Sequence, residues 1–246
     1  MKKIILLLLL LMQALLAEEV YATFDVVSNK SSDLGLSVSG VVGSLYVDVG
    51  DTVKKGTLLL SLKNDQEQQE VNSARTAVAI AQKYAEHSQK IYDRYAKISD
   101  VIDKEKMENY IYNRDINALN LKNALNTLHL REIQLAKTQL RAPYDLVVTK
   151  KMTELGNIVL GSQTKLLSVT SPKDIKLVLK FDEKYWKEIK IGQKFTYKVD
   201  GSNMTYQGTI SKIYPTVIQS TRKMQAEVKA FNLMPGLFGS GMITVK

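Results

Sequence analysis

The chain has 246 residues, with 34 lysines and arginines against 25 aspartates and glutamates, which gives a formal net charge of +9 at pH 7. It contains no cysteine, so a disulfide framework is excluded and stability must come from packing alone. The charge is unevenly placed: residues 18–170 carry 19 basic against 19 acidic residues, whereas residues 171–246 carry 13 against 6. Such a charge fits a solvated surface and does not by itself indicate a nucleic-acid partner.

Residues 1–17 have the pattern of a secretory signal peptide. Met1 and two lysines are followed by an apolar run from Ile4 to Leu16, which only Gln13 interrupts, and then by Ala17. This run is shorter than an ordinary membrane-spanning helix requires. Since the residue two positions before Ala17 is a leucine rather than a small residue, a retained anchor is the second interpretation. No cysteine follows the run, which excludes a lipid-anchored form.

Two stretches of strand character, residues 34–64 and 140–170, share the same internal order. In each, an apolar strand leads to a turn with a glycine (Gly50 or Gly156), then to a short strand, a second glycine (Gly56 or Gly161) and a final apolar strand. β-Branched runs between turn residues are typical of strands. We therefore predict that the two stretches are halves of one small β-sandwich and close on each other in space.

Between these halves, residues 65–139 contain neither glycine nor proline, so nothing breaks a helix except a change of pattern from Ile98 to Lys104. On both sides of this break, residues recur at spacings of three and four, as in the seam of a coiled coil. The expected seam consists of Val71, Ala74, Val78, Ala81, Ala85, Ser88, Tyr92 and Tyr95 in the first arm, and of Ile111, Arg114, Ala118, Leu121, Leu125, Leu128, Glu132 and Leu135 in the second. We predict an antiparallel coiled-coil hairpin with arms of roughly 50 Å.

Residues 171–246 alternate apolar runs with turns and hold the net positive charge. Lysines recur every three or four residues from Lys173 to Lys198, although the runs around them have strand character. Only the segment from Asp182 to Lys190 is expected to form a helical turn. In that turn, Trp186 is interpreted as either a core anchor or an interface anchor.

These segments resemble a known family. The motif VDVGDTVKKGTLLLSL at residues 47–62 resembles the first half-motif of lipoyl and biotinyl domains, and residues 140–169 resemble the second. A lipoyl domain split by a long helical hairpin resembles the periplasmic adaptors, or membrane fusion proteins of the HlyD and RND type, of tripartite efflux pumps. The motifs KEIKIGQKFTYKVDG at residues 187–201 and LMPGLFGSGMITV at residues 233–245 resemble the β-barrel of that family.

The resemblance implies an elongated α+β fold. Residues 18–33 would add a strand to the barrel, residues 34–64 and 140–170 would form the split lipoyl-like β-sandwich, and residues 65–139 would form the hairpin. Residues 171–246 would form the C-terminal β-barrel, and no membrane-proximal domain is expected. One departure from the family is Leu146, which stands where the family has a glycine after the aspartate.

At the hairpin tip, the family carries an arginine, leucine and serine pattern that docks on the outer-membrane channel. Arg94 and Ile98 keep the first spacing, but the turn is shorter and Asp103 falls where the serine is expected. The resemblance thus implies Arg94, Ile98 and Asp103 as docking residues. The alternatives are an ordinary exposed helical arginine for Arg94 and a helix N-cap for Asp103, and capping is compatible with docking.

The function implied by the resemblance is that of an adaptor without enzymatic activity, in the periplasm of a Gram-negative bacterium. It would link an inner-membrane transporter to a TolC-type outer-membrane channel, and its copies would form a ring that seals a conduit for drugs or other xenobiotics. The transporter is expected to be of the RND class, with an ABC-type exporter as the alternative. The barrel residues Lys184, Trp186, Lys187 and Lys190 are expected to face the pump or an anionic inner-membrane surface, unless the lysines serve solubility alone.

Other classes of function have less support. No catalytic, cofactor or metal site is expected, because no glycine-rich phosphate loop opens a helix and the two histidines, His87 and His129, fall in the predicted hairpin. A swinging-arm carrier domain would need a modifiable lysine on a tight turn between the lipoyl halves, where this chain has the helical insertion. A coiled-coil spacer would explain the hairpin, but neither the split lipoyl motif nor the barrel.

Overall fold

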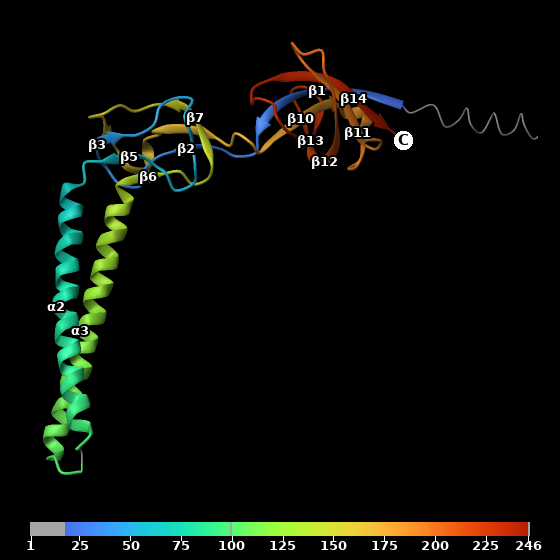
Figure 1. Cartoon of the computed structure of the whole chain (residues 1–246). Coiled ribbons are helices and arrows are strands. Elements are labelled where there is room, and N and C mark those ends of the chain that lie inside the picture. Colours follow the sequence, from blue (N-terminus) through green and yellow to red (C-terminus); the bar gives the residue numbers. More distant parts are fainter. Residues whose placement is uncertain (1–17, 99, 246) are drawn as a thin grey trace, which may run out of the picture. The chain divides into compact units, whose positions relative to one another are not determined.

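The computed structural model describes residues 18–98 and 100–245, so the predicted signal segment 1–17 lies outside the described residues. The described chain divides into two compact units, one of residues 18–32, 144–147 and 169–245, the other of residues 33–143 and 148–168 without Ser99. The first unit holds a closed β-barrel, and the second holds a small sandwich and two long helices (Figure 1). Two helices with a mostly β body and a six-stranded barrel confirm the predicted α+β class.

The barrel strands are antiparallel and follow the order β1-β10-β13-β12-β11-β14, closed by pairing of β14 with β1. On β1, Thr23 lies opposite Lys180 of β10 on one side and Ser240 of β14 on the other. A strand near the start of the described chain thus completes a barrel built from the last third. The bounds are β1 Glu18–Ser28, β10 Ile175–Asp182, β11 Lys194–Val199, β12 Thr205–Ile218, β13 Lys223–Ala230 and β14 Phe238–Val245.

Alternation along each strand explains the lysine spacing of the last third. On β10, Ile175, Leu177, Leu179 and Phe181 are buried, while the residues between them are half-buried and face outward. A strand turns successive side chains to opposite faces, so its lysines lie on the outer wall. Lys176 donates to Glu227 of β13 at 2.5 Å, and Lys180 donates to Asp25 of β1 at 2.6 Å.

Two glycines of β14 make room for the aromatic part of the barrel core. Phe24 meets Phe195 edge to face with 5.9 Å between ring centroids, and it meets Tyr197 at 5.2 Å. A Cβ atom at Gly239 would lie 2.7 Å from the Phe24 ring, and one at Gly241 would lie 2.8 Å from the Phe195 ring. The rings therefore occupy space that any side chain at these two positions would need.

The second unit is centred on the small β-sandwich. Its two sheets have the strand orders β2-β9-β7-β4 and β6-β5-β3-β8. The bounds are β2 Ser31–Leu34, β3 Gly40–Leu45, β4 Thr52–Val53, β5 Leu58–Leu62, β6 Gln139–Arg141, β7 Leu146–Lys151, β8 Ile158–Val159 and β9 Leu167–Thr170, with a 3₁₀ turn, η1, at Gly161–Gln163.

The two similar halves bond to each other through equivalent turns. Gly50 donates its backbone N–H to the carbonyl of Val148 at 2.9 Å, and Gly156 donates to the carbonyl of Val42 at 2.9 Å. Gly50 and Gly156 have φ values of +94° and +85°, which glycine adopts without steric cost. Leu146, the departure noted in the sequence, is fully buried at the start of β7 and so contributes to the core.

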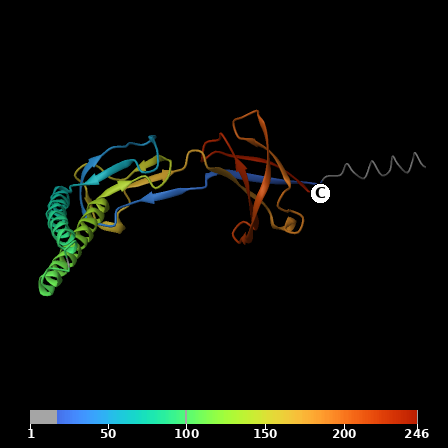
Figure 2. The same cartoon turned by 60° about the horizontal axis from the view of Figure 1, so that its bottom comes forward.

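The helices α2 (Asp65–Ala96) and α3 (Lys104–Lys137) leave the sandwich and return to it as a hairpin, lying side by side in both views (Figures 1 and 2). Every α2 residue of the predicted seam is buried or half-buried, and three of them are buried: Val71, Ala74 and Ser88. The helical hairpin is therefore present, while the interlocking side-chain packing of a coiled coil stays a prediction.

The second arm is rotated relative to the predicted seam, which is a correction. Half-buried as predicted are Arg114, Leu121, Leu128 and Leu135, but Ile111, Ala118, Leu125 and Glu132 are exposed. Tyr110, Asn117, Ala124 and Arg131, each one residue before a predicted position, are half-buried instead, as are Ile116 and Gln134.

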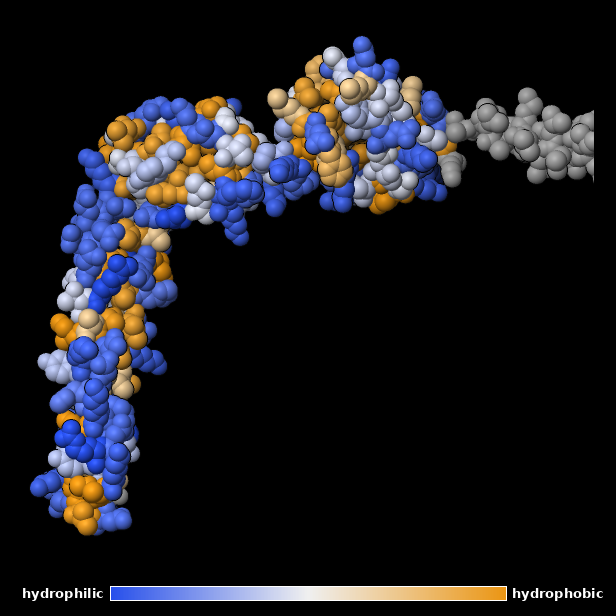
Figure 3. Space-filling view, viewed as in Figure 1, coloured by the Kyte–Doolittle hydropathy of each residue, from blue (hydrophilic) through white to orange (hydrophobic). Residues whose placement is uncertain are grey.

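Partners on α2 explain this rotation. The Tyr110 ring stacks on Tyr95 with 4.5 Å between centroids, and Arg131 donates to Glu70 at 2.9 Å. Long aromatic and cationic side chains thus occupy the seam, and aliphatic residues of α3 face solvent. Figure 3 shows such apolar patches between the polar surfaces of the hairpin.

Candidate functional site

The tip of the hairpin is the turn between the end of α2 at Ala96 and the start of α3 at Lys104. Two aliphatic side chains are exposed in it, Ile98 at 48% and Val101 at 83%. Their backbones form consecutive turns, because Ile98 donates to the Tyr95 carbonyl at 3.1 Å and Val101 donates to the Ile98 carbonyl at 3.2 Å. The tip therefore presents a small apolar surface held by backbone hydrogen bonds.

The predicted docking residues lie at this end of the hairpin. Arg94 is exposed in the last turn of α2, where a cation interacts favourably with the helix dipole. Among the described residues it has no ion-pair partner. Asp103 is the N-cap of α3, and its Oδ1 accepts the backbone N–H of Lys106 at 3.2 Å. A role in docking stays a prediction for Arg94, Ile98 and Asp103.

Sequence reasoning missed Val101, the most exposed of the tip side chains named here. The available signal was the β-branched pair Val101 and Ile102 between Asp100 and Asp103, of which Ile102 is half-buried. An apolar side chain in such a place has no core to enter, so its exposure follows from the shortness of the turn.

Aromatic contacts hold the two arms together just behind the tip. Besides the stacked pair of Tyr95 and Tyr110, the Arg114 guanidinium lies 4.2 Å from the centroid of the Tyr92 ring. Arg114 also pairs with Asp115 at 2.7 Å, and this hydrogen-bonded pair raises the pKa of Arg114. A hydrogen bond with Tyr95, together with desolvation, raises the pKa of the Tyr110 hydroxyl. These contacts fix the tip without a buried core.

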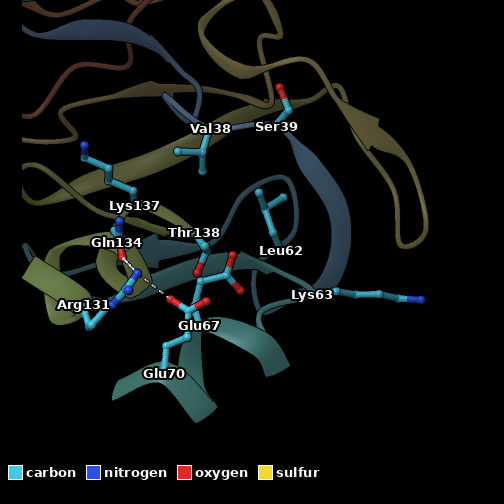
Figure 4. Close-up of a pocket in the computed structure, with 10 residues that line it drawn as sticks. All are labelled: Val38, Ser39, Leu62, Lys63, Glu67, Glu70, Arg131, Gln134, Lys137 and Thr138. Atoms are coloured by element: carbon cyan, nitrogen blue, oxygen red, sulfur yellow. Dashed lines mark hydrogen bonds and ion pairs between the residues drawn. The ribbon is translucent and has the colours of Figure 1, made fainter. Parts of the chain in front are cut away.

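The root of the hairpin contains a polar cavity of about 450 Å³ (Figure 4). In the close-up, Arg131 and Gln134 of α3 point toward Glu70 of α2, and Arg131 donates to both at 2.9 Å. The lining residues carry both charge signs: Lys63, Arg131 and Lys137 against Glu67 and Glu70. Since these charges oppose one another, the cavity favours no charged ligand. The ion pair of Arg131 with Glu70 connects the start of α2 to the end of α3.

The loop after β10 holds the predicted partner-facing residues of the barrel. A short 3₁₀ turn, η2 (Glu183–Tyr185), is followed by Trp186, which is 62% exposed, and by Ile189, which is buried in the barrel core. Trp186 is therefore not a core anchor. Lys184, Lys187 and Lys190 are exposed in the same loop, and the Lys187 ammonium lies 5.0 Å from the centroid of the indole ring.

A cleft of about 640 Å³ adjoins this loop. Trp186 lines it together with Pro215, Val217 and Met224, while Asp182 and Glu183 supply acidic groups at its edge. Arg222 lies 3.6 Å from Glu183. The loop thus combines an exposed indole with charges of both signs, which suits a protein contact at least as well as a lipid surface.

The described residues offer few side chains that could bind a metal ion or catalyse a reaction. Residues 18–98 and 100–245 contain no group of three or more histidine, aspartate or glutamate side chains arranged to hold a metal ion. His87 and His129 are both exposed, on α2 and α3 respectively. Of the helices in these residues, none has the length and apolarity needed to cross a membrane.

Comparison of sequences gives distant relatives, and no family model matches the chain. The chain is 24% identical over 221 residues to the cobalt-zinc-cadmium resistance protein CzcB of Cupriavidus metallidurans, covering 85% of this chain and 42% of the relative. It is 25% identical over 220 residues to the macrolide export protein MacA of Yersinia pestis, covering 82% of this chain and 59% of the relative. The chain therefore spans less than two thirds of either relative.

Comparison of structures gives a closer likeness. The crystal structure of MacA from Actinobacillus actinomycetemcomitans matches with a TM-score of 0.74 at 23% identity, covering 94% of this chain and 79% of that one. The chain has the fold of the membrane fusion proteins. These are the periplasmic adaptors of efflux pumps, so the resemblance predicted from the sequence is confirmed. Within the adaptor fold, the hairpin tip and the Trp186 loop are the candidate sites for partners.

Proposed function

We propose that the chain is a non-enzymatic periplasmic adaptor, which links an inner-membrane efflux transporter to a TolC-type outer-membrane channel in a Gram-negative bacterium. The observation that carries this proposal is the hairpin, which exposes aliphatic residues at its tip and along its sides although the sandwich and barrel have complete cores. Exposed apolar surface of this kind marks an interaction site. The adaptor fold of the relatives supports the same role.

The tip is proposed to bind the channel. Ile98 and Val101 offer an apolar centre, and Arg94 offers a fork of donors for carbonyls or carboxylates on helix ends of the partner. Asp103 would dock while it caps α3. An apolar centre ringed by charges is the usual anatomy of a specific protein contact.

The flanks of the hairpin are proposed to join copies of the chain into a ring. On α2, Ile80 and Tyr84 are exposed at 54% and 62%, and on α3, Leu125 and Ile133 are exposed at 48% and 40%. Helix geometry places the α2 pair and the α3 pair on opposite flanks of an antiparallel hairpin. Two different flanks that fit each other give a head-to-tail contact, which closes into a ring rather than stopping at a dimer.

The barrel is proposed to face the transporter through the Trp186 loop, with Lys184, Lys187 and Lys190 beside the indole. An anionic inner-membrane surface is the second partner for these lysines, each of which would contribute about 1 kcal/mol near anionic lipid. We propose a transporter of the RND class, with an ABC-type exporter as the alternative. The relatives are named for metal-cation resistance and for macrolide export, and we propose drugs and other xenobiotics as the cargo.

The test is complementation of export in a strain that lacks its own adaptor. The chain is expressed with a transporter of either class and a TolC-type channel, and resistance is measured against macrolides and other drugs and against cobalt, zinc and cadmium salts. The expected result is resistance that depends on both partners, that is lost with Arg94→Asp or Val101→Asp, and that is kept with Lys90→Asp. Lys90 is an exposed α2 residue away from the tip, so it controls for the change of charge.

The ring is tested by cross-linking, since the chain has no cysteine of its own. Ile80 and Leu125 stand at about the same height of the hairpin, as judged from the opposed pair Tyr95 and Tyr110. Ile80→Cys with Leu125→Cys is expected to give a ladder of oxidised oligomers, and neither single variant should do so. Absence of resistance with every transporter, together with absence of the ladder, contradicts the proposed function.

A further inference from the structure

The strands β12 and β13 pair over part of their length and meet other strands at one end. The two strands pair from Ile210 opposite Val228 to Ile218 opposite Lys223. Before Ile210, residues 205–209 of β12 pair with β11, and the end of β13 near Ala230 pairs with β10. At Gly208 the two strands are still close, because a Cβ atom there would clash with the Val228 side chain.

A cleft of about 670 Å³ lies beside this end of the two strands, within the size range of small-molecule sites. Its floor is the half-buried Tyr206 ring, which stacks with 5.5 Å between centroids on Tyr197, a ring that is only 5% exposed. On its other side, Tyr197 stacks on Phe195 at 5.3 Å. Because Phe195 belongs to the barrel core, the floor is held rigidly before any ligand arrives.

The rim of the cleft supplies a further ring and polar donors. Phe231 follows β13 and is 72% exposed, which is unusual for a phenylalanine that has a core beside it. Gln207 and Asn232 also line the cleft and bring side-chain amides. A planar molecule against Tyr206 would cover the Phe231 ring, and this burial is the driving force for binding.

Charge selects the class of ligand. Lys229 is the one charged residue of the cleft lining, which contains no aspartate or glutamate. Lys229 is exposed and has no ion-pair partner among the described residues, whereas the neighbouring strand residue Lys176 is neutralised by Glu227. The clefts at Trp186 and at the hairpin root both contain acidic side chains. Burial, with the nearby Tyr206, raises the pKa of Tyr197, so its hydroxyl stays neutral and adds no negative charge.

We propose that this cleft binds a planar aromatic anion, such as an aromatic carboxylate or sulfonate, with its ring against Tyr206 and Phe231 and its acid group at Lys229. This binding site is separate from the predicted contacts of an adaptor with channel, transporter and neighbouring copies, and it does not depend on them. The cation of Lys229 attracts the acid group, and the aromatic rings give the site its preference for flat molecules.

Fluorescence titration of the full-length protein with 8-anilinonaphthalene-1-sulfonate tests the proposal, with N-phenyl-1-naphthylamine as the neutral probe of the same shape. The expected result is saturable binding in which the sulfonate binds more tightly. Lys229→Glu should weaken the sulfonate roughly tenfold and leave the neutral probe unchanged. Phe231→Ala should weaken both probes roughly three- to tenfold.

Matched controls lie elsewhere on the same barrel. Phe238 is 61% exposed and Lys198 is exposed, and neither lines the cleft, so Phe238→Ala and Lys198→Glu should bind both probes as the wild type does. Circular dichroism melts must show that all variants are folded. The proposal is overturned if Phe231→Ala binds as the wild type does, or if Phe238→Ala loses as much affinity as Phe231→Ala. Equal effects of Lys229→Glu on both probes would overturn the assignment to an anion.

Discussion

The barrel and the hairpin are stabilised in different ways. Phe24, Phe181 and Phe195 are almost fully buried in the barrel, in one continuous apolar cluster. In the hairpin, α2 buries only Val71, Ala74 and Ser88, and α3 buries no residue among those described. The arms are held instead by stacked rings, a guanidinium over a ring and ion pairs.

This difference indicates which part of the molecule is complete by itself. A barrel with a filled core gains most of its stability from burial that is already present. Two helices with a thin seam gain less, and exposed residues such as Leu125 and Ile80 still have apolar surface to bury. The hairpin is therefore the part that we expect to gain stability from partners.

The largest expected effect is in the barrel core. Phe195→Ala removes a ring that contacts Phe24 and Tyr197 and should destabilise the protein by about 3–5 kcal/mol. In the hairpin, Leu128→Ala removes a half-buried side chain and should cost only about 1–2 kcal/mol. Denaturant unfolding, followed by circular dichroism, measures both. Equal losses would contradict the comparison between barrel and hairpin.

The next effect concerns the closeness of the two arms. Ala85 is half-buried in the α2 seam, so Ala85→Trp should force the helices apart and cost about 1–3 kcal/mol. Ala77→Trp is the control, because Ala77 is exposed on the same helix. Thermal melts at 222 nm compare the two variants. If Ala85→Trp and Ala77→Trp have the same melting temperature, small residues do not set the distance between the arms.

The smallest effect concerns a polar cluster on the barrel wall, where Glu227 accepts from Lys176 at 2.5 Å and from Tyr214 at 2.6 Å. Burial alone would raise the pKa of the Glu227 carboxyl, but the hydrogen bonds from Lys176 and Tyr214 outweigh it, so the pKa lies below its ordinary value. A depressed folded pKa stabilises the protein above the unfolded value of about 4.3. That contribution is lost as the pH falls through the folded pKa.

Glu227→Gln should accordingly cost about 1–2 kcal/mol at pH 7. The difference in the free energy of unfolding between this variant and the wild type should shrink as the pH falls below about 5. Midpoints of urea unfolding over that pH range measure it. Asp25→Asn is the control, since its pair with Lys180 is more exposed and should contribute less than about 1 kcal/mol. A difference that does not change with pH would exclude the carboxylate as its source.

The sequence predicted one arm of the hairpin better than the other. In α2, a single set of small and apolar residues has heptad spacing, so Ala81 and Ser88 were placed correctly in the seam. In α3, apolar residues occur around much of the helix, and two neighbouring phases fit the spacing of three and four equally well. Only the partners decide between them: Tyr110 meets Tyr95, and Arg131 meets Glu70. A pattern within one helix contains no information about those partners.

Local signals also predicted turns and caps, but not exposure. The glycines Gly50 and Gly156 and the N-cap Asp103 need only their immediate neighbours to be recognised. Trp186 had two interpretations, because a loop tryptophan enters a core or leaves it depending on what fills the barrel. The cleft beside Gly208 is lined by residues of β11 and β12 and by the end of β13, which only the closure of the barrel brings together, so short-range patterns could not predict it.

The root of the hairpin makes its length an adjustable quantity. The start of α2 lies beside the end of α3, since Asn64 donates to the Thr138 hydroxyl at 3.0 Å and Leu62 donates to the Thr138 carbonyl at 2.9 Å. The start of α2 and the end of α3 therefore join the sandwich at one place, whatever the length of the arms. Removing seven residues from each arm would shorten the reach by roughly 10 Å and keep the same faces in contact. The distance from the sandwich to the tip can thus change in steps of seven residues per arm, while the residues of the root and of the tip stay the same.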